Sequence, residues 1–197
     1  AASLWIVRRV GRLLEKRANA RLGWLGERMV AEHLQACGAA GFHLVHDVPA
    51  ENNGHEFNLD HVAIGENALV VIETKMRSKP ADKASHEIEV VFDGKRLSWP
   101  RYSNDTKSVW QVGAAADWLR GFVRQECGID VSVKTVIAIP GWKVKEKILS
   151  QPRVVSGKGV AAAVEQAANA ISAMPLSRDQ REKIRQILES KCRDTQH

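Results

Sequence analysis

Two spacings of apolar residues recur along the chain, and together they predict a mixed α/β protein. Apolar residues at i, i+3, i+4 and i+7 indicate amphipathic helices, whereas short continuous or alternating runs indicate strands. The predicted elements are helices over 3–18 and 23–36, strands over 42–48, 56–64 and 68–76, a hairpin of strands over 87–92 and 95–99, a helix over about 108–125, strands over 133–141 and 153–157, and helices over 160–173 and 177–190. This order predicts one α/β domain with a mixed sheet over 23–197, preceded by a basic helix within 1–22.

The turn between the second and third strands determines which residues oppose one another. With residues 65–68 as the turn, a two-residue and a four-residue loop both pair residues whose numbers sum to 133. Asp60 then lies opposite Glu73, with about 5 Å between the two Cβ atoms. Alternation along each strand places Lys75 on the face of Glu73 and Asn58 on the face of Asp60.

Two carboxylates on neighbouring strands repel each other and lose hydration near a core, so positive charge is expected between them. Lys75 supplies one charge, and a divalent cation would supply the rest. Mg²⁺ suits such a site, because it needs only one or two protein carboxylates and keeps water ligands that a phosphate can replace. A salt-bridge cluster capped by Lys75 explains the same spacing, and both interpretations stay open.

Two helices each carry a polar residue on the face that should pack against the core. Glu27 lies on the apolar stripe of the second predicted helix, and Gln111 lies on the stripe of the helix that follows the hairpin. Either residue alone is an ordinary first-turn polar residue. Both together, beside a sheet that carries Asp60 and Glu73, favour a shared polar site.

The composition is globular, and the charge is unevenly distributed. The chain has 197 residues, 44% of them hydrophobic and 26% charged, which is enough for a sizeable core. Lys and Arg exceed Asp and Glu by 29 to 23, and the net charge of +6 favours a polyanionic partner. Residues 51–66 hold four acidic residues and no Lys or Arg. A basic body around an acidic centre differs from a uniformly basic nucleic-acid-binding protein.

Cysteine usage and hydropathy favour a cytoplasmic protein. Three cysteines lie far apart without a CxxC motif, so neither a disulfide framework nor a cysteine zinc site is indicated. No run of about 18 apolar residues exists, so no membrane span is predicted. The sequence starts without Met, and residues 1–22 hold six Lys or Arg beside one Glu. This segment is either an ordinary cationic amphipathic helix or a contact with a membrane surface in a longer protein.

The segment around the predicted hairpin mixes basic and aromatic side chains. Such a mixture suits phosphate contact combined with base stacking. A solvated loop anchored by its aromatic residues is an equally good interpretation, and the basic stretch IPGWKVKEK leaves the same two interpretations open. The candidate nucleic-acid-binding residues are Lys95, Arg96, Trp99, Arg101 and Tyr102.

Three stretches resemble the motifs of a known family. They are GWLGERMVAEHL, LDHVAIGENALVVIETKMRSK and WQVGAAADWL, between Gly23 and Leu119. They look like the nuclease-related domain (NERD) family of the PD-(D/E)xK, or restriction-endonuclease-like, superfamily. The resemblance implies an αβββαβ core with a mixed sheet, here with an extra β-hairpin and flanking helices. It also implies hydrolysis of nucleic-acid phosphodiester bonds with Mg²⁺ or Mn²⁺ as cofactor.

Carried over by position, the resemblance implies a metal site on the two central strands. Asp60 and Glu73 would be metal ligands, and the Thr74 carbonyl would complete the protein's share. Asn58 stands where relatives often carry an acid, which leaves the number of metal ions, one or two, open.

The resemblance also implies roles for three further residues. Lys75 would orient or help deprotonate the attacking water and stabilise the charged transition state. Glu27 would contribute to the metal site, and Gln111 would position the site or the substrate. The expected catalytic residues are Glu27, Asp60, Glu73, Lys75 and Gln111.

The sequence therefore predicts a Mg²⁺- or Mn²⁺-dependent nuclease, with DNA favoured over RNA. The alternative is a noncatalytic nucleic-acid-binding module on the same fold, associated with a membrane through the basic N-terminus. Loss of Glu73 or Lys75 would favour the alternative, and both residues are present.

Overall fold

The computed structural model describes residues 2–79, 89–169 and 175–194. The helices are α1 (Ala2–Ala39), α2 (Lys107–Cys127), α3 (Val160–Ala168) and α4 (Arg178–Asp194), with a short 3-10 turn η1 (Gly157–Gly159) before α3. The strands are β1 (His43–Asn52), β2 (His55–Ile64), β3 (Leu69–Thr74), β4 (Glu89–Phe92), β5 (Leu97–Ser98), β6 (Val133–Ile139), β7 (Lys143–Glu146) and β8 (Arg153–Ser156).

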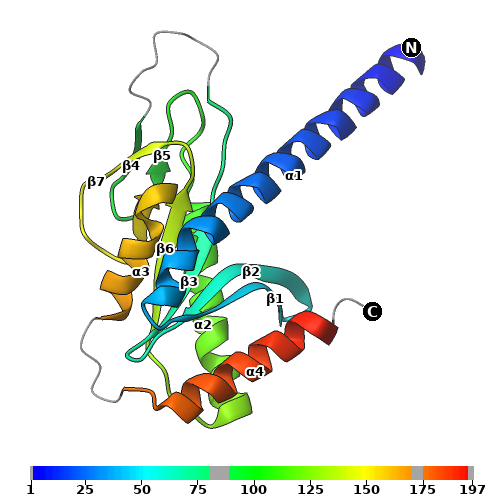
Figure 1. Ribbon diagram of the computed structural model, residues 1–197. Coiled ribbons are helices and arrows are strands. Elements are labelled where there is room, and N and C mark those ends of the chain that lie inside the picture. Colours follow the sequence, from blue (N-terminus) through cyan, green and yellow to red (C-terminus); the bar gives the residue numbers. More distant parts are fainter. Residues whose placement is uncertain (1, 80–88, 170–174, 195–197) are drawn as a thin grey trace.

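The predicted α/β architecture with a mixed sheet is confirmed. The main sheet has the strand order β1-β2-β3-β6-β8, in which β1, β2 and β3 are antiparallel and β3, β6 and β8 are parallel. Helices α1 and α3 pack on one face, and α2 and α4 pack on the other (Figure 1). A small sheet, β5-β4-β7, lies beside the main one. The carboxyl ends of the three parallel strands therefore meet at one edge, where open α/β sheets bind their ligands.

The apolar run of β3 is buried on both sides. Leu69 and Val71 contribute to the core beneath α2 and α4, whereas Val70 and Ile72 contribute to the core beneath α1 and α3. A strand covered on both faces needs apolar residues at every position. The polar residues that follow Ile72 therefore mark the place where the strand leaves the core.

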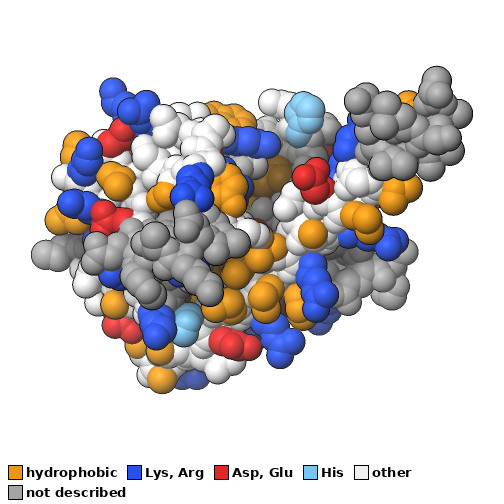
Figure 2. All heavy atoms as spheres, turned by 90° about the horizontal axis from the view of Figure 1, so that it is seen from above, with side chains coloured by type: hydrophobic (Ala, Val, Ile, Leu, Met, Phe, Trp, Pro, Cys, Tyr) orange, Lys and Arg blue, Asp and Glu red, His pale blue; other side chains and the backbone are white. Residues whose placement is uncertain are grey.

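The two helices predicted at the N-terminus are one continuous helix, which corrects the prediction. α1 runs unbroken from Ala2 to Ala39, so the predicted division between residues 22 and 23 falls inside it. Its N-terminal half projects away from the domain (Figure 1), and hydrophobic and basic side chains lie along it in Figure 2. Trp5, Leu13 and Leu14 are exposed in this half. Within the described helices, none combines the length and apolarity needed to cross a bilayer.

The hairpin and the last helix follow their local sequence signals. β4 and β5 are antiparallel around Gly94, which has a positive φ of 93°, while the Asp93 carboxylate accepts hydrogen bonds from two backbone N–H groups of the turn, at 3.0 Å each. Ser177 is a favoured N-cap residue at the start of the predicted last helix, and its Oγ accepts a hydrogen bond from the Gln180 backbone N at 3.2 Å, which confirms this start.

One strand was missed, and several element boundaries differ from the predictions. β7 was not predicted, because its sequence KVKE offers one apolar residue; it pairs in parallel with β4. The strand predicted over 68–76 ends at Thr74. α3 ends at Ala168, and the remainder of the helix predicted to 173 lies partly outside the described residues, as do positions 87 and 88 of the predicted hairpin.

Candidate active site

β2 and β3 pair in the register that the turn predicts. The pairs run from Ile64 with Leu69 to His61 with Ile72, and each sums to 133. Asp60 and Glu73 come one step beyond the last of these pairs. The predicted register is confirmed over these four pairs, and it brings the two carboxylates to the end of β3.

The end of β3 is held in place from two sides. The Thr74 backbone N donates a hydrogen bond to Asp60 Oδ2 at 2.7 Å, and Thr74 Oγ1 lies 3.3 Å from His61 Nε2. His61 is buried, and its Nδ1 lies 2.7 Å from Nδ1 of His46. Burial lowers the pKa of His61 to about 3, so the ring is neutral. His61 therefore packs behind Thr74 and fixes the strand end that carries Glu73.

A cavity of about 770 Å³ collects three of the five predicted catalytic residues. It lies between β2, the β1–β2 turn, the end of β3 and the first turns of α2. Asp60, Glu73 and Gln111 line it, and so does Asn58. The complete lining is Asn52, Asn53, His55, Glu56, Phe57, Asn58, Asp60, Glu73, Trp110, Gln111, Ala114 and Ala115.

Gln111 faces this cavity because of how α2 packs. The buried stripe of α2 is Val112, Ala115, Ala116, Leu119 and Val123. Gln111 lies beside this stripe and is half-buried, so the predicted stripe through Gln111 is displaced by one position. The helix start is fixed by Asp105, whose carboxylate accepts hydrogen bonds from the Ser108 backbone N and from Ser108 Oγ, both at 2.9 Å.

Glu27 approaches the site from the opposite side, on α1. The contact depends on Gly26, where a Cβ atom would lie 2.9 Å from Met76 Cβ and 3.3 Å from Thr74 Cγ2. Only glycine allows α1 to lie this close to the end of β3. Glu27 is half-buried and is not part of the cavity lining, but its charge raises the pKa values of Asp60 and Glu73.

The electrostatics are those of a site that is short of positive charge. Burial, and then the charge of Glu73, raise the pKa of Asp60 far above its usual range, although the Thr74 N–H opposes the rise. Burial likewise raises the pKa of Glu73, which Lys75 partly counteracts. Burial also raises the pKa of Glu27. Perturbed carboxyl groups gathered at one place are typical of functional sites.

These raised pKa values predict how stability depends on pH without metal. Above about pH 4 the folded carboxyl groups hold protons that the unfolded chain has released, so the unfolding free energy falls as the pH rises through this window. We expect Glu73→Gln to fall less steeply than wild type between about pH 5 and about pH 8. Thermal unfolding in a chelator measures both slopes. Wild type and variant have the same other titrating groups. Equal slopes would therefore show that the pKa of Glu73 is not raised in the folded protein.

The residues at the end of β3 fit a hard divalent cation. Asp60 and Glu73 offer two carboxylates, and Mg²⁺ is satisfied by such a pair together with water. Among residues 2–79, 89–169 and 175–194, no group of three or more His, Cys, Asp or Glu side chains is placed to hold a metal ion. A bound ion would therefore rely on the two carboxylates and on water. The role of the Thr74 carbonyl stays a prediction.

The aromatic residues of the 93–107 segment anchor it to the domain. Trp99 is 4% exposed and packs edge-to-face on Trp142, with ring centroids 5.2 Å apart. The Arg77 guanidinium lies 4.8 Å from the Trp99 ring and 5.1 Å from the Tyr102 ring, while the Tyr102 hydroxyl donates to the Ser78 carbonyl at 2.7 Å. A ring as buried as Trp99 offers no face to a nucleobase, so the anchoring interpretation holds for it.

The basic residues of the same segment remain on the surface. Lys95, Arg96 and Arg101 are exposed, and Arg96 pairs with Asp93 at 3.1 Å. Their contact with nucleic acid stays a prediction.

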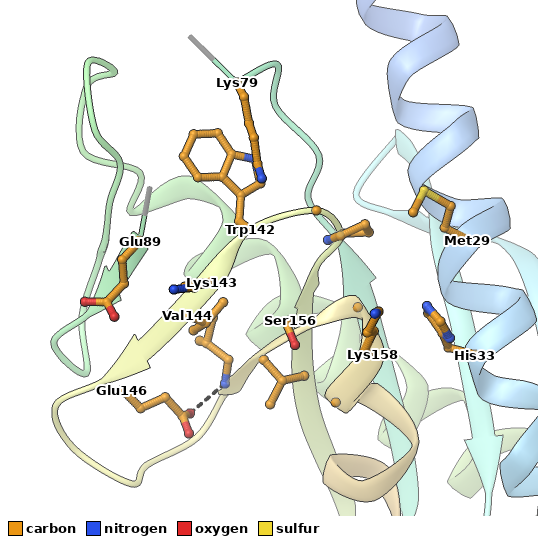
Figure 3. A pocket seen from close by; sticks show the side chains of 16 residues that line it. Met29, His33, Lys79, Glu89, Trp142, Lys143, Val144, Glu146, Ser156 and Lys158 are labelled. Atoms are coloured by element: carbon orange, nitrogen blue, oxygen red, sulfur yellow. Dashed lines mark hydrogen bonds between the residues drawn. The ribbon is translucent and has the colours of Figure 1, made fainter. Parts of the chain in front are cut away.

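A second cavity, of about 790 Å³, lies between α1, the segment after β6 and the segment after β8 (Figure 3). We call it the basic cavity, because Lys79, Lys143 and Lys158 line it from three separate segments. Its walls come from α1, the β6–β7 loop, β7, β8 and η1. Two acidic residues, Glu89 on β4 and Glu146, also line it, and Glu146 pairs with Arg153, 3.1 Å away.

The basic cavity is linked by hydrogen bonds to the segment that follows β3, although the two cavities have no lining residue in common. Trp142 Nε1 donates to the carbonyl of Arg77, two residues after Lys75, at 3.0 Å. The Lys75 backbone N in turn donates to the Ala138 carbonyl at 2.9 Å. Sequence reasoning identified the basic stretch that contains Lys143 but not the cavity, because Lys79 and Lys158 are far from it in the chain.

Trp110 was also missed by sequence reasoning. It immediately precedes Gln111, is 71% exposed and lines the cavity that holds the two carboxylates. The signal in the sequence was its place next to Gln111, a predicted site residue. The other tryptophan of this helix, Trp118, is half-buried.

Comparison with known families identifies the family of the chain. Residues 22–140 match the model of the nuclease-related domain, more than half of the 197 residues. The chain therefore belongs to the nuclease-related domain family, and a nuclease-related function that involves nucleic acid follows from this membership. No curated protein and no solved structure matches the chain.

Proposed function

We propose that the protein is a Mg²⁺- or Mn²⁺-dependent nuclease with DNA as its favoured substrate, built on a restriction-endonuclease-like αβββαβ core. The observation that carries the proposal is the pair Asp60 and Glu73, two partly buried carboxylates with raised pKa values in one cavity with Gln111. Such a pair is costly without a cation, and the family is nuclease-related.

Each site residue has a chemical role in this proposal. Asp60, Glu73 and the Thr74 carbonyl would hold the ion, which when bound supplies Lewis acidity to the phosphate and lowers the pKa of bound water. The Lys75 ammonium lies near Glu73, whose pKa it lowers, and it stabilises the charge that grows on the phosphate oxygens. Gln111 orients the substrate from α2.

Hydrolysis consumes one water molecule for each bond broken. The water oxygen forms a bond to phosphorus, and the bond from phosphorus to one bridging oxygen breaks. Lys75 orients the water or helps to remove its proton, and the bridging oxygen leaves as a hydroxyl group after it gains a proton. One product strand ends in a phosphate and the other ends in a hydroxyl.

The cleavage assay for this proposal uses supercoiled DNA, linear DNA and RNA, each with Mg²⁺ or Mn²⁺ and each with a chelator. We expect cleavage when Mg²⁺ or Mn²⁺ is present and no cleavage in the chelator. We also expect DNA to be cleaved faster than RNA. The second candidate function is a noncatalytic nucleic-acid-binding module, with the basic helix α1 on a membrane surface. The basic cavity favours it, because phosphate binding there requires no metal. Binding without cleavage under every condition would select this second function.

The contributions of the basic cavity and of the 93–107 segment to nucleic-acid binding can be separated by their salt dependence. We expect the triple variant Lys79→Ala, Lys143→Ala and Lys158→Ala to weaken DNA binding and to reduce the slope of log K against log salt by about 2 to 3, because each phosphate contact contributes about 0.9. Fluorescence anisotropy across a salt series measures this slope.

The matched control is the triple variant of the insert, Lys95→Ala, Arg96→Ala and Arg101→Ala. It should also weaken binding and flatten the slope, but by less, because Arg96 is already paired with Asp93. An unchanged slope in the first variant would remove the basic cavity from the binding surface. An unchanged slope in the second variant would show that the 93–107 segment has a structural role and does not contact nucleic acid.

A further inference from the structure

The cavity that holds Asp60 and Glu73 has walls suited to a nucleobase. Besides the carboxylates of Glu56, Asp60 and Glu73 and the methyl groups of two alanines, its lining is made of amides and aromatic rings. The amides belong to Asn52, Asn53, Asn58 and Gln111, and the rings to Phe57, Trp110 and His55. Its volume of about 770 Å³ is in the range of small-molecule sites, which combine apolar walls with a few polar groups. Amides can pair with base edges, and rings can stack on base faces.

Trp110 exposes a large aromatic surface beside this cavity. It is 71% exposed, whereas Trp99 and Trp142 are buried and Trp118 is stacked on Phe122. Among the described tryptophans outside α1, it alone leaves most of its ring in water. A large aromatic surface beside a polar cavity offers the stacking platform that single-stranded nucleic acids use.

The charge distribution assigns the cavity to a base rather than to a chain of phosphates. Glu56, Asp60 and Glu73 line it, and within the described part of the chain no Lys or Arg does. A phosphate is therefore tolerated only where a cation bridges the two carboxylates, and a second phosphate deeper in the cavity would be repelled. Lys79, Lys143 and Lys158 lie instead in the basic cavity.

We infer that this cavity receives an unpaired nucleobase adjacent to the scissile phosphate, stacked on Trp110 and hydrogen-bonded by the amides around it. The inference rests on the proposed function for the position of the scissile phosphate. A base in a duplex must first leave the stack, at the cost of unstacking and unpairing. The protein therefore prefers single-stranded, frayed or gapped nucleic acid to a continuous duplex.

The test measures binding in the Glu73→Gln background, so that cleavage does not interfere. A single-stranded oligonucleotide and a blunt duplex of the same sequence are compared, and the single strand carries one 2-aminopurine, whose emission falls on stacking. We expect the single strand to bind at least about tenfold more tightly. Trp110→Ala should lower single-strand affinity about tenfold and restore the emission, while duplex affinity changes little.

Two further variants separate stacking from general damage. Trp110→Phe keeps an aromatic face and should retain most of the affinity. Trp5→Ala removes an exposed tryptophan from the projecting end of α1, far along the chain from the cavity, and should change nothing. Because Trp110 is mostly exposed, its replacement should leave the melting temperature unchanged. If Trp110→Ala does not fold, the strand preference of the parent and the behaviour of Trp110→Phe still decide.

Equal affinity for single strand and duplex, or full affinity in Trp110→Ala, would overturn the inference. Either result leaves the proposed nuclease activity standing, since that depends on cleavage by the wild type. Conversely, a Trp110-dependent preference for single strands without any cleavage would retain the base pocket and reject the nuclease.

Discussion

Replacing Glu73 with Gln is expected to reduce Mg²⁺-dependent cleavage to background, a loss of at least about a thousandfold, while the fold and nucleic-acid affinity stay largely intact. The substitution keeps the shape of the side chain and removes one of the two charges that would hold the ion. Glu73 is partly buried at the end of β3, and burial raises its pKa. Relief of repulsion with Asp60 should also raise the melting temperature of the metal-free protein.

The matched control for this variant is Glu66→Gln. Glu66 lies in the β2–β3 turn, is exposed and has the same side chain, but it is outside the cavity. It should cleave at the wild-type rate. Cleavage by Glu73→Gln within about tenfold of wild type would show that this carboxylate is not a required ligand and would reassign the pair to structure.

Lys75→Ala is expected to lower turnover by at least about a hundredfold and to retain divalent-ion binding, because Lys75 is not expected to be a ligand. Its backbone is fixed on β6 through the Ala138 carbonyl, and its charge lowers the pKa of Glu73. Together with the hydrogen bonds from Ser108, its charge also lowers the pKa of Asp105, so the ammonium lies near both acidic groups. Cleavage kinetics and calorimetric Mn²⁺ titration on the same preparation measure the two properties.

Two lysine variants complete this experiment. Lys75→Arg keeps the charge with a different geometry and should recover part of the turnover. Lys134→Ala changes a lysine near the opposite, amino end of β6 and should have no effect. If Lys75→Ala lost ion binding together with turnover, the lysine would be acting on the metal site itself, and its assignment to the transition state would be wrong.

The parts of the fold that follow from local rules could be predicted from the sequence. The length of the turn over 65–68 and the two-residue period of strands fix the register of β2 and β3. The continuous apolar run of β3 predicts its burial on both faces. In the same way, Asp93-Gly94 predicts the hairpin, and Ser177 as an N-cap residue predicts the start of α4.

What could not be predicted depends on neighbours that are distant in the chain. The sequence KVKE has no strand pattern of its own, and β7 forms because β4 offers it a partner. The helix α1 continues through Gly23 and Gly26, where a local rule favours a stop, and Gly26 serves a close approach to Met76 and Thr74.

The candidate site shows the same division. Strand register brings Asp60 to Glu73, and helix periodicity points Glu27 and Gln111 inward, although the cavity includes only the second of these two. The burial of Trp99 and the exposure of Trp110 follow from tertiary packing. Because composition alone does not distinguish one tryptophan from another, the prediction included the buried Trp99 and omitted the exposed Trp110.

Calorimetric titration of the wild-type protein with Mn²⁺, alone and with a single-stranded oligonucleotide, is the most direct test of the metal site. We expect the ion to bind and its affinity to fall as the pH is lowered, because the raised pKa values of Asp60 and Glu73 make protons compete with the metal. Asp60→Asn and Glu73→Gln should each weaken this binding strongly. A wild-type protein that binds no divalent ion, even with nucleic acid present, would rule out the metal site of Asp60 and Glu73 and favour the noncatalytic binding module.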